Sequence, residues 1–395
     1  MASANKEALW TPAFVLMCIS NFLLFFSFYQ LLPVLPAYLL DEFHASLSVS
    51  GLILAIYTLS ALIIRPFSGF IADSVVRKPL HVVCLLIFIS LFAGYLFATT
   101  LLLIALLRAV HGMAFGMVTV SGSTLAIDIM PSSRRGEGLA FFGVTSSLAM
   151  ATGPMSGLFL LKHYSYNTNF LTALASGLAA WLFVLFVRAK PHPRHHHQAI
   201  SLDRFFLLKG THGAIGLMMM ASLYGALLSY VALFAREVGL ADEAGYFFVT
   251  LAFGVALSRL GSGKLIDRGR MVELIVAGKV ILVASTALFA LFPNPWIFLA
   301  SSVLMGVGCG LIGPCYQNLF INLAEHSQRG TANSTFFTAW DMGIGFGTLV
   351  GGLVAQRASY QAIFLCGVLL VACSLAYFLR FTARHYHANK LDRTA

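Results

Sequence analysis

Three ionisable side chains lie inside long apolar stretches of the sequence, where a charge is costly to bury. Asp341 occurs in the middle of one stretch, and Arg108 and His111 share another. A carboxyl whose surroundings change between two conformations can bind a proton in one and release it in the other. Arginine stays charged at physiological pH, and histidine titrates near neutrality in ordinary surroundings. The pattern favours Asp341 as the proton-coupling or substrate-charge residue. It favours Arg108 as a charge that tunes a nearby proton site or contacts substrate, and His111 as a further titratable candidate for the coupling.

Each of the three residues also has a structural interpretation. Asp341 can make a hydrogen bond between helices, Arg108 can tie two helices together, and His111 can be a packing residue. A cation inside a membrane needs a carbonyl, a carboxylate or water beside it, so one of these is expected next to Arg108. Asp128 is a weaker acidic candidate because it falls near the end of its apolar segment.

The composition indicates a protein whose solvent is lipid. Of 395 residues, 59% are hydrophobic and 10% are charged, and the mean hydropathy is +0.85. Soluble domains carry about 25% charged residues, so a soluble enzyme, a disordered chain and a secreted disulfide scaffold are excluded. The six cysteines fall in apolar segments without a CxxC pair, which predicts packing rather than a redox or metal site. We expect no cofactor, and a single mid-segment acid argues against an intramembrane enzyme.

The long apolar segments predict an all-α integral membrane protein with twelve transmembrane helices. A spanning helix needs about 20 apolar residues, whereas an outer-membrane barrel shows shorter alternating segments. The first segment lacks a cleavage pattern and is expected to remain a helix. The twelve segments are 11–38, 47–72, 80–98, 101–126, 138–160, 167–187, 209–235, 244–266, 271–292, 296–320, 332–356 and 359–380.

The formal charge of +10 is unevenly distributed. Most lysines and arginines fall in loops on one side of the predicted membrane, and the opposite loops hold only Lys162, Arg236 and Arg357. Since positive loops face the cytoplasm, both termini are expected there, in a multi-pass plasma membrane such as a bacterial inner membrane. This bias explains the charge without a nucleic-acid partner. The histidines at 195–197 lie in a basic connector and lack the spacing of a metal site.

Two segments 194 residues apart share one pattern. Arg65–Asp73 and Arg259–Asp267 both read R-x-x-S-G-x-x-x-D. The same offset relates two Arg-Gly pairs and two glycine pairs, namely Arg135-Gly136 with Arg329-Gly330, and Gly153 and Gly157 with Gly347 and Gly351. We expect two six-helix bundles related by pseudo-twofold symmetry, at 1–187 and 209–395, joined by a cytoplasmic basic linker at 188–208. Parallel repeats of six helices are typical of transporters.

Three motifs resemble those of the major facilitator superfamily. The segment Gly69–Lys78 is similar to its loop motif G-x-x-x-D-x-x-G-R-K, with Val76 in place of the last glycine. Arg108–Gly112 resembles the helix-four motif R-x-x-Q-G, with His111 at the glutamine position. Gly153–Gly157 resembles the G-P-x-x-G motif of the antiporter branch, the drug:proton and sugar-efflux permeases. The resemblance implies a twelve-helix transporter that works by alternating access.

Carboxylates at two predicted helix ends are candidate gating groups. Asp73 and Asp267 can accept hydrogen bonds from the exposed N–H groups at a neighbouring helix start, where the helix dipole favours negative charge. The alternative is a solvated charge cluster that only sets topology. The candidate gating residues are Asp73, Arg77, Lys78, Asp267, Arg268, Arg270, Arg135 and Arg329.

Polar and aromatic residues inside the predicted spans are candidate substrate contacts, because amides are costly on a lipid-facing surface. They are Asn21, Tyr29, Gln30, Tyr57, Tyr224, Tyr230, Tyr316, Gln317, Asn318 and Trp340. Tyr29, Tyr57 and Tyr230 can instead belong to an interfacial aromatic belt. Small residues allow close helix contact, and a proline kinks a helix; the packing candidates are Gly153, Pro154, Gly157, Gly347 and Gly351.

Together these patterns predict a proton-coupled secondary transporter that exports a small organic molecule such as a drug, sugar or metabolite. The alternative is a proton symporter that imports a sugar or an organic acid. The expected partners are the small-molecule substrate, protons and the lipid bilayer, and the protein is expected to be a monomer. The sequence has no nucleotide-binding motif, so ATP hydrolysis is not expected.

Overall fold

The computed structural model describes residues 8–189 and 201–391, and in these ranges the chain is helical, with no strand. Twelve of its helical segments are long and apolar enough to cross a membrane. This count confirms the predicted all-α membrane fold. The basic connector with its histidines, Lys190 and Arg194 lies outside the described residues, as does Arg393.

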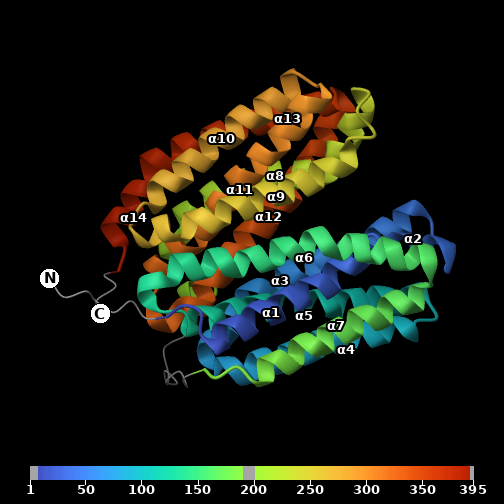
Figure 1. The fold of residues 1–395 in the computed structure, drawn as a ribbon, viewed down its shortest axis with the longest axis horizontal. Coiled ribbons are helices and arrows are strands. Elements are labelled where there is room, and N and C mark those ends of the chain that lie inside the picture. The colour runs from blue at the N-terminus through green and yellow to red at the C-terminus, as the bar shows by residue number, and fades with distance from the viewer. Residues whose placement is uncertain (1–7, 190–200, 392–395) are drawn as a thin grey trace. The chain divides into compact units, whose positions relative to one another are not determined.

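The chain divides into two compact units. Unit 1 comprises residues 1–133 and 145–205, and unit 2 comprises 134–144 and 206–395. The long helices of the first half are α1 (Pro12–Leu31), α2 (Val34–Asp41), α3 (Leu47–Ser74), α4 (Arg77–Leu96), α5 (Leu101–Ile129), α6 (Arg135–His163) and α7 (Tyr166–Leu185) (Figure 1). Those of the second half are α8 (Thr211–Glu237), α9 (Ala244–Asp267), α10 (Met271–Leu291), α11 (Pro295–Leu323), α12 (Arg329–Arg357) and α13 (Tyr360–Tyr377).

Three boundaries differ from those expected from the sequence. The first third of α6 groups with unit 2 while the rest groups with unit 1, so a single helix belongs to both units. The final span is longer than predicted, because α13 continues through a π-helix (Phe378–Thr382) into α14 (Ala383–Asn389). The first span is also longer, since α1 and α2 are separated only by a short break before Val34.

Side-chain caps start corresponding helices in both halves. Thr100 accepts a hydrogen bond from Leu103 N at 3.2 Å where α5 begins, and Asn294 accepts one from Ile297 N at 2.9 Å where α11 begins. Such caps satisfy backbone donors that have no partner within the helix. The two caps are 194 residues apart, and the helices that follow them are both 29 residues long. The local sequence signals therefore repeat with the same offset as the motifs.

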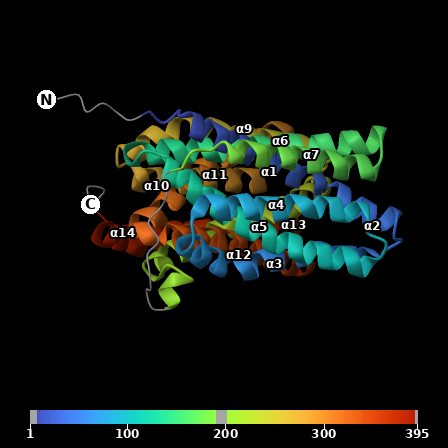
Figure 2. The same cartoon turned by 90° about the horizontal axis from the view of Figure 1, so that it is seen from below.

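Helices within each unit run lengthwise along their neighbours, as α4 does along α5 in Figure 2. In unit 1, α3 packs on α5, and in unit 2 the corresponding helices α9 and α11 pack in the same way. A Cβ added to Gly112 would lie 2.1 Å from Tyr57 O, and one added to Gly306 would lie 2.1 Å from Leu251 O. Because these glycines are also 194 residues apart, the repeat extends to individual backbone contacts.

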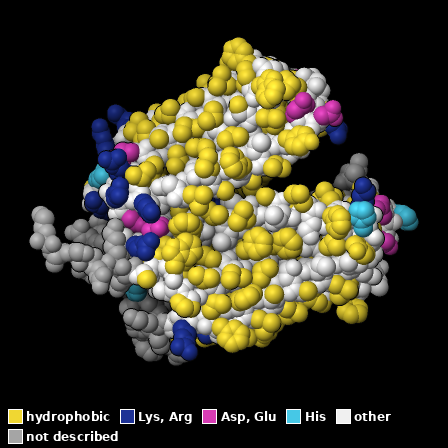
Figure 3. Space-filling model, viewed as in Figure 1, with side chains coloured by type: hydrophobic (Ala, Val, Ile, Leu, Met, Phe, Trp, Pro, Cys, Tyr) yellow, Lys and Arg dark blue, Asp and Glu magenta, His cyan; other side chains and the backbone are white. Residues whose placement is uncertain are grey.

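The outer faces of the units suit lipid. Large apolar side chains such as Leu52, Leu102 and Leu349 are 62%, 70% and 72% exposed. Figure 3 shows hydrophobic side chains along the middle of the helices and charged ones gathered near their ends. Because apolar side chains at this density would be unfavourable in water, the surface supports the membrane location.

The predicted packing glycines lie at close helix contacts. A Cβ on Gly157 would lie 2.1 Å from Gln30 O, and Gly153 packs against the same turn of α1. Gly347 packs against Ser222 O of α8, and Gly351 against the ring of Tyr230. Pro154 lies within α6 between the first two glycines, where it removes one backbone donor.

Gly347→Ala is expected to destabilise the protein strongly, because the new methyl carbon would lie 1.8 Å from Ser222 O. Gly345→Ala is the matched control: it lies in the same helix and nothing is within 4 Å of its added Cβ. Thermal unfolding in detergent should show a clearly lower Tm for the first variant and an unchanged or slightly higher Tm for the second. Equal Tm values for the two would contradict the tight α8–α12 contact.

Candidate functional site

An ion cluster joins the end of α3 to the start of α4 in unit 1. Arg77 Nη1 donates to both oxygens of Asp128 at 2.6 and 2.7 Å, and its Nη2 donates to Asp73 at 3.0 Å. The side chains of Arg77 and Asp73 are 2% and 3% exposed. Charge-assisted hydrogen bonds of this length are strong. The cluster therefore holds the α3–α4 turn against the end of α5, which carries Asp128.

Lys78 has a different partner from Arg77. Its Nζ donates to Leu185 O at 3.0 Å, at the last residue of α7. A cation at a helix C-terminus is favoured by the helix dipole. The two adjacent basic residues therefore bind two different helices.

Asp267 caps a helix in unit 2. Its two carboxylate oxygens accept from Gly136 N at 2.7 Å and from Glu137 N at 2.9 Å, at the first turn of α6. Arg134 pairs with Glu137 at 2.8 Å beside this contact. An anion at a helix N-terminus satisfies unpaired N–H groups and interacts favourably with the dipole. Asp267 is thus bound to the part of α6 that belongs to unit 2.

The second half does not reproduce the basic part of the first cluster, contrary to the expectation from repeat symmetry. The residues 194 positions after Arg77 and Asp128 are Met271 and Asn322. Arg268 and Arg270 are exposed, and within the described chain neither makes an ion pair or a side-chain hydrogen bond. The charge pair of unit 1 is therefore replaced by neutral residues in unit 2.

The other two gating candidates lie at helix starts. Arg135 opens α6 and is 7% exposed, and Arg329 opens α12 and is half-buried. Each is followed by a glycine in the first turn of its helix, and the N–H of Gly136 donates to Asp267.

Arg108 lies in an aromatic box of unit 1. Its side chain is 4% exposed, and its Cζ lies 4.0 Å from the centre of the Tyr57 ring. Tyr95 is close enough for the guanidinium to act on it electrostatically. Among the described residues, no carboxylate lies within 4.0 Å of Arg108. The guanidinium instead lies over an aromatic face, which attracts a cation through its quadrupole and was not predicted from the sequence.

His111 lies beside Arg108 and is 1% exposed. Its Nδ1 is 3.1 Å from the hydroxyl of Tyr95, and its ring centre is 4.5 and 4.8 Å from those of Phe88 and Phe92. The hydroxyl of Tyr57 and the Nε2 of His111 are buried and have no hydrogen-bond partner in the structure. Tyr57, predicted as a substrate contact or belt residue, is instead part of this buried box.

Asp341 lies near the middle of α12 in unit 2 and is half-buried. The preceding residue, Trp340, has its ring 5.4 Å from that of Tyr224 on α8 and 6.3 Å from that of Phe336. Every other acid in the described helices lies near a helix end. Asp341 is therefore a half-buried acid in a mid-span position, next in sequence to a residue of an aromatic cluster.

The remaining predicted substrate residues of unit 1 have partners within that unit. Gln30 is fully buried and donates to Thr172 Oγ1 at 2.5 Å and to Asn169 O at 3.2 Å. Asn21 donates to Thr145 Oγ1 at 2.8 Å. Tyr29 is half-buried, with its ring 5.1 Å from that of Phe28. Of the three, Tyr29 has the most surface available to a ligand.

The corresponding residues of unit 2 fall into two groups. Tyr316 and Asn318 are 0% exposed, so a substrate cannot contact them in this conformation and their placement favours packing. Gln317 is half-buried and donates to Asn333 Oδ1 at 2.9 Å. The hydroxyl of Tyr230 donates to Thr348 O at 2.6 Å and links α8 to α12.

One buried cation, Lys279, was not predicted from the sequence, and neither were the partners of two others, Arg65 and Arg259. Lys279 in α10 is 0% exposed, and it could have been noticed as a single lysine in the apolar segment 271–292. Arg65 and Arg259 were identified only as the first residues of the repeated pattern R-x-x-S-G-x-x-x-D. In the structure, Arg65 donates to Thr119 Oγ1 at 2.7 Å and Arg259 donates to Gly143 O. Each of these cations is bound to neutral groups on a neighbouring helix.

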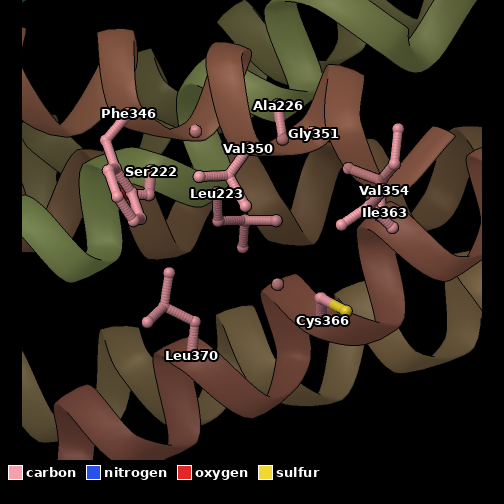
Figure 4. A pocket seen from close by; sticks show the side chains of 12 residues that line it. Ser222, Leu223, Ala226, Phe346, Val350, Gly351, Val354, Ile363, Cys366 and Leu370 are labelled. Carbon is pink, nitrogen blue, oxygen red and sulfur yellow. The ribbon is translucent and has the colours of Figure 1, made fainter. Parts of the chain in front are cut away.

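The crevices of the two units lie away from these ionisable groups. In unit 2 an apolar crevice lies between α8, α12 and α13, and Figure 4 shows Phe346, Val350 and Leu370 around it. In unit 1 a wider, more polar hollow at the end of α2 contains Asp41 and Glu42. Among the described residues, no three histidine, cysteine or acidic side chains form a metal-binding group.

Comparison of the sequence with models of protein families identifies the family of this chain. The model of the Major Facilitator Superfamily matches residues 17–291 and 241–395. The chain belongs to the major facilitator superfamily. It is a membrane transporter and not an enzyme, as the motifs predicted, and its partners include small-molecule substrates and the lipid bilayer.

Superfamily members of similar length share about a quarter of its residues. The chain is 25% identical over 373 residues to the quinolone resistance protein NorA of Staphylococcus aureus (strain MRSA252), covering 89% of this chain and 93% of the relative. It is 23% identical to the staphylopine export protein of Staphylococcus aureus (strain Mu50), covering 91% and 94%.

Solved structures share the fold. The crystal structure of the human organic anion transporter MFSD10 (TETRAN) has a TM-score of 0.81 at 17% identity, covering 93% of this chain and 98% of that chain. The transporter FucP in its outward conformation has a TM-score of 0.79 at 16% identity, covering 96% and 99%. At these identities the likeness establishes the superfamily fold.

Proposed function

We propose that this superfamily member exports a small organic molecule in exchange for protons, by alternating access. The observation that carries the proposal is Asp341, a half-buried acid in the middle of α12 that follows Trp340 in the sequence. The relatives named for quinolone resistance and staphylopine export support the outward direction. Binding of substrate near Trp340 and binding of a proton to Asp341 would then compete for the same environment.

The other residues have supporting roles in this proposal. Arg108 and His111 form a buried cationic and titratable pair that tunes proton binding. The Arg77 cluster and Asp267 stabilise a conformation that is closed at their end of the helices. We place that end, and both termini, on the cytoplasmic side of a bacterial inner membrane, because the basic residues gather there. The protein works as a monomer of two repeats joined through 188–208.

Transport in intact cells tests the direction. A fluorescent quinolone is the first probe, followed by a panel of drugs, sugars and metabolites. An exporter keeps intracellular accumulation low, and accumulation rises when an uncoupler collapses the proton gradient. A proton symporter gives the opposite result, namely high accumulation that falls with the uncoupler. Accumulation that is the same with and without the protein for every compound would contradict the proposal.

Asp267→Asn is expected to change transport rate more than substrate affinity. The amide keeps one acceptor oxygen but loses the charge that interacts with the start of α6. The closed state should therefore be less stable, and turnover in proteoliposomes should fall several-fold while the KM stays near that of the wild type. Glu273→Gln, near the start of α10 and without a side-chain ion pair in the described chain, is the control. A change in KM alone would contradict the gating role.

A further inference from the structure

Lys279 is a buried cation that the proposed function does not use. Its Nζ donates to Ser374 O at 3.1 Å and to Ser374 Oγ at 2.5 Å, so it links α10 to α13. The remaining N–H faces aromatic rings, since the ring centres of Tyr316 and Phe378 lie 5.4 and 5.3 Å from Nζ. An ammonium group has three donors and no acceptor. This arrangement therefore accommodates the charged form of the lysine.

The groups that contact the Nζ of Lys279 in the described part of the chain are neutral. Among the described residues, no carboxylate lies within 4.0 Å of its Nζ. Tyr316 from α11 is a titratable side chain that faces it, and the hydroxyl of Tyr316 has no hydrogen-bond partner among residues 8–189 and 201–391. The histidine of α8 is His212, and its Nδ1 makes a hydrogen bond with the hydroxyl of Tyr377. A buried amine without a counter-charge can lose its proton more readily than one in an ion pair can.

Ser374 connects the lysine to a third helix. While its Oγ accepts from Lys279, its hydroxyl hydrogen is donated to Gly216 O of α8 at 2.7 Å. About two turns after Ser374, Thr382 Oγ1 donates to His212 O of α8 at 3.1 Å. Thr382 is the last residue of the π-helix Phe378–Thr382, and π-helical turns occur frequently at functional sites. We call the hydrogen-bonded contact between α13 and α8 the α8–α13 seam. The bond from Ser374 to Gly216 O in this seam depends on the direction in which the Ser374 hydroxyl points.

We propose that Lys279 is a proton-binding site whose occupancy decides whether Ser374 bonds to α8. In the charged form, Nζ donates to Ser374 Oγ and the hydroxyl hydrogen goes to Gly216 O. When the amine loses its proton, its lone pair accepts the hydroxyl hydrogen of Ser374. Gly216 O then loses its side-chain donor, and the α8–α13 seam is weakened. One proton is bound or released, and no other group changes its protonation state.

This site is connected to the substrate region through α8. Gly225 of α8 is in close contact with α12, because a Cβ on it would lie 2.2 Å from Ile344 O. Tyr224, the residue before it, has its ring 5.4 Å from Trp340. A change in the α8–α13 seam is thereby transmitted to the aromatic pair beside Asp341. The inference rests on the proposed proton coupling and adds a second, separate proton-binding group to it.

The fluorescence of Trp340 tests the inference without substrate. Trp10, Trp181 and Trp296 are replaced by phenylalanine, and Asp341→Asn removes the adjacent carboxyl, so that neither transport nor Asp341 titration contributes. The purified protein in nanodiscs is titrated from acid to alkaline pH. In this background we expect one pH transition of Trp340 emission. It should be lost in Lys279→Met, in Lys279→Gln and in Ser374→Ala.

Matched variants separate proton binding from packing. Ser285→Ala removes a buried hydroxyl of α10 that bonds only to its own helix, at 2.7 Å to Ile281 O, and it should keep the transition. Lys279→Arg should lock the signal at the acid end, while the two neutral variants lock it at the alkaline end. The inference is overturned by an unchanged transition in Lys279→Met, or by the absence of any transition in the background protein. Neither result would affect a transport measurement that depends on Asp341.

Discussion

Asp341→Asn is expected to abolish proton-driven transport while the protein remains folded and continues to bind substrate. The amide has nearly the same shape as the carboxyl but cannot bind or release a proton in this pH range. Since Asp341 is the mid-span acid of the described helices, the proton gradient then has no direct means to drive the cycle. In proteoliposomes with an imposed pH gradient, uptake or release should fall to the level of empty liposomes.

Counterflow distinguishes loss of coupling from loss of the protein. In substrate exchange without a gradient, Asp341→Asn should retain activity, because exchange needs the conformational change but no net proton movement. Asp242→Asn, an exposed acid in the turn before α9, is the matched control and should behave as the wild type in both assays. Full gradient-driven transport in the Asp341 variant would remove this residue from the mechanism and leave Lys279 as the stronger candidate.

The sequence carries enough information for the fold because the membrane simplifies the problem. A long apolar segment must be a helix in lipid, since every backbone donor and acceptor has to be satisfied within it. The twelve spans followed from this rule, and the 194-residue repeat set the correspondence between helices. The caps Thr100 and Asn294 mark equivalent helix starts and could have been read from the sequence as well.

The direction of each side chain within the bundle could not be predicted in the same way. A helix that is apolar all round gives no stripe from which to decide which face meets protein and which meets lipid. Tyr316 and Asn318 were therefore grouped with the substrate contacts, whereas the structure buries both completely, Tyr316 near Lys279 and Asn318 against Met271. Tyr57 was assigned in the same way and lies against Arg108 instead.

Tertiary partners explain most of the remaining differences. The pairing of Arg77 with Asp128 joins residues 51 positions apart on two helices, and no local pattern encodes it. The repeat suggested a second basic cluster at Arg268 and Arg270, because basic residues follow the acid in both halves. That comparison matched residue types near the turn and not aligned positions. Position by position, the repeat places Met271 and Asn322 there. A repeat therefore predicts the backbone more reliably than it predicts the charges carried on it.

This difference between the halves leads to an experiment in which the chain supplies its own control. Arg77→Met leaves the carboxylates of Asp73 and Asp128 without the cation that binds both of them. Removing one partner of a buried ion pair costs about 3–5 kcal/mol, because the other charge remains uncompensated. We expect a large drop in the Tm in detergent and little folded protein in the membrane.

The double variant Arg77→Met, Asp128→Asn should recover most of that stability. It gives unit 1 the same methionine and asparagine that unit 2 has at Met271 and Asn322, where an acid, Asp267, remains at the helix end. Replacing a buried pair with neutral residues of similar size is often close to neutral in stability. If the double variant were as unstable as Arg77→Met alone, the cost would lie in the loss of the arginine itself, through its packing and its bond to Asp73, rather than in the carboxylate of Asp128. If it regained stability but not turnover, the ion cluster would be required for gating in a way that the neutral version in the second half is not.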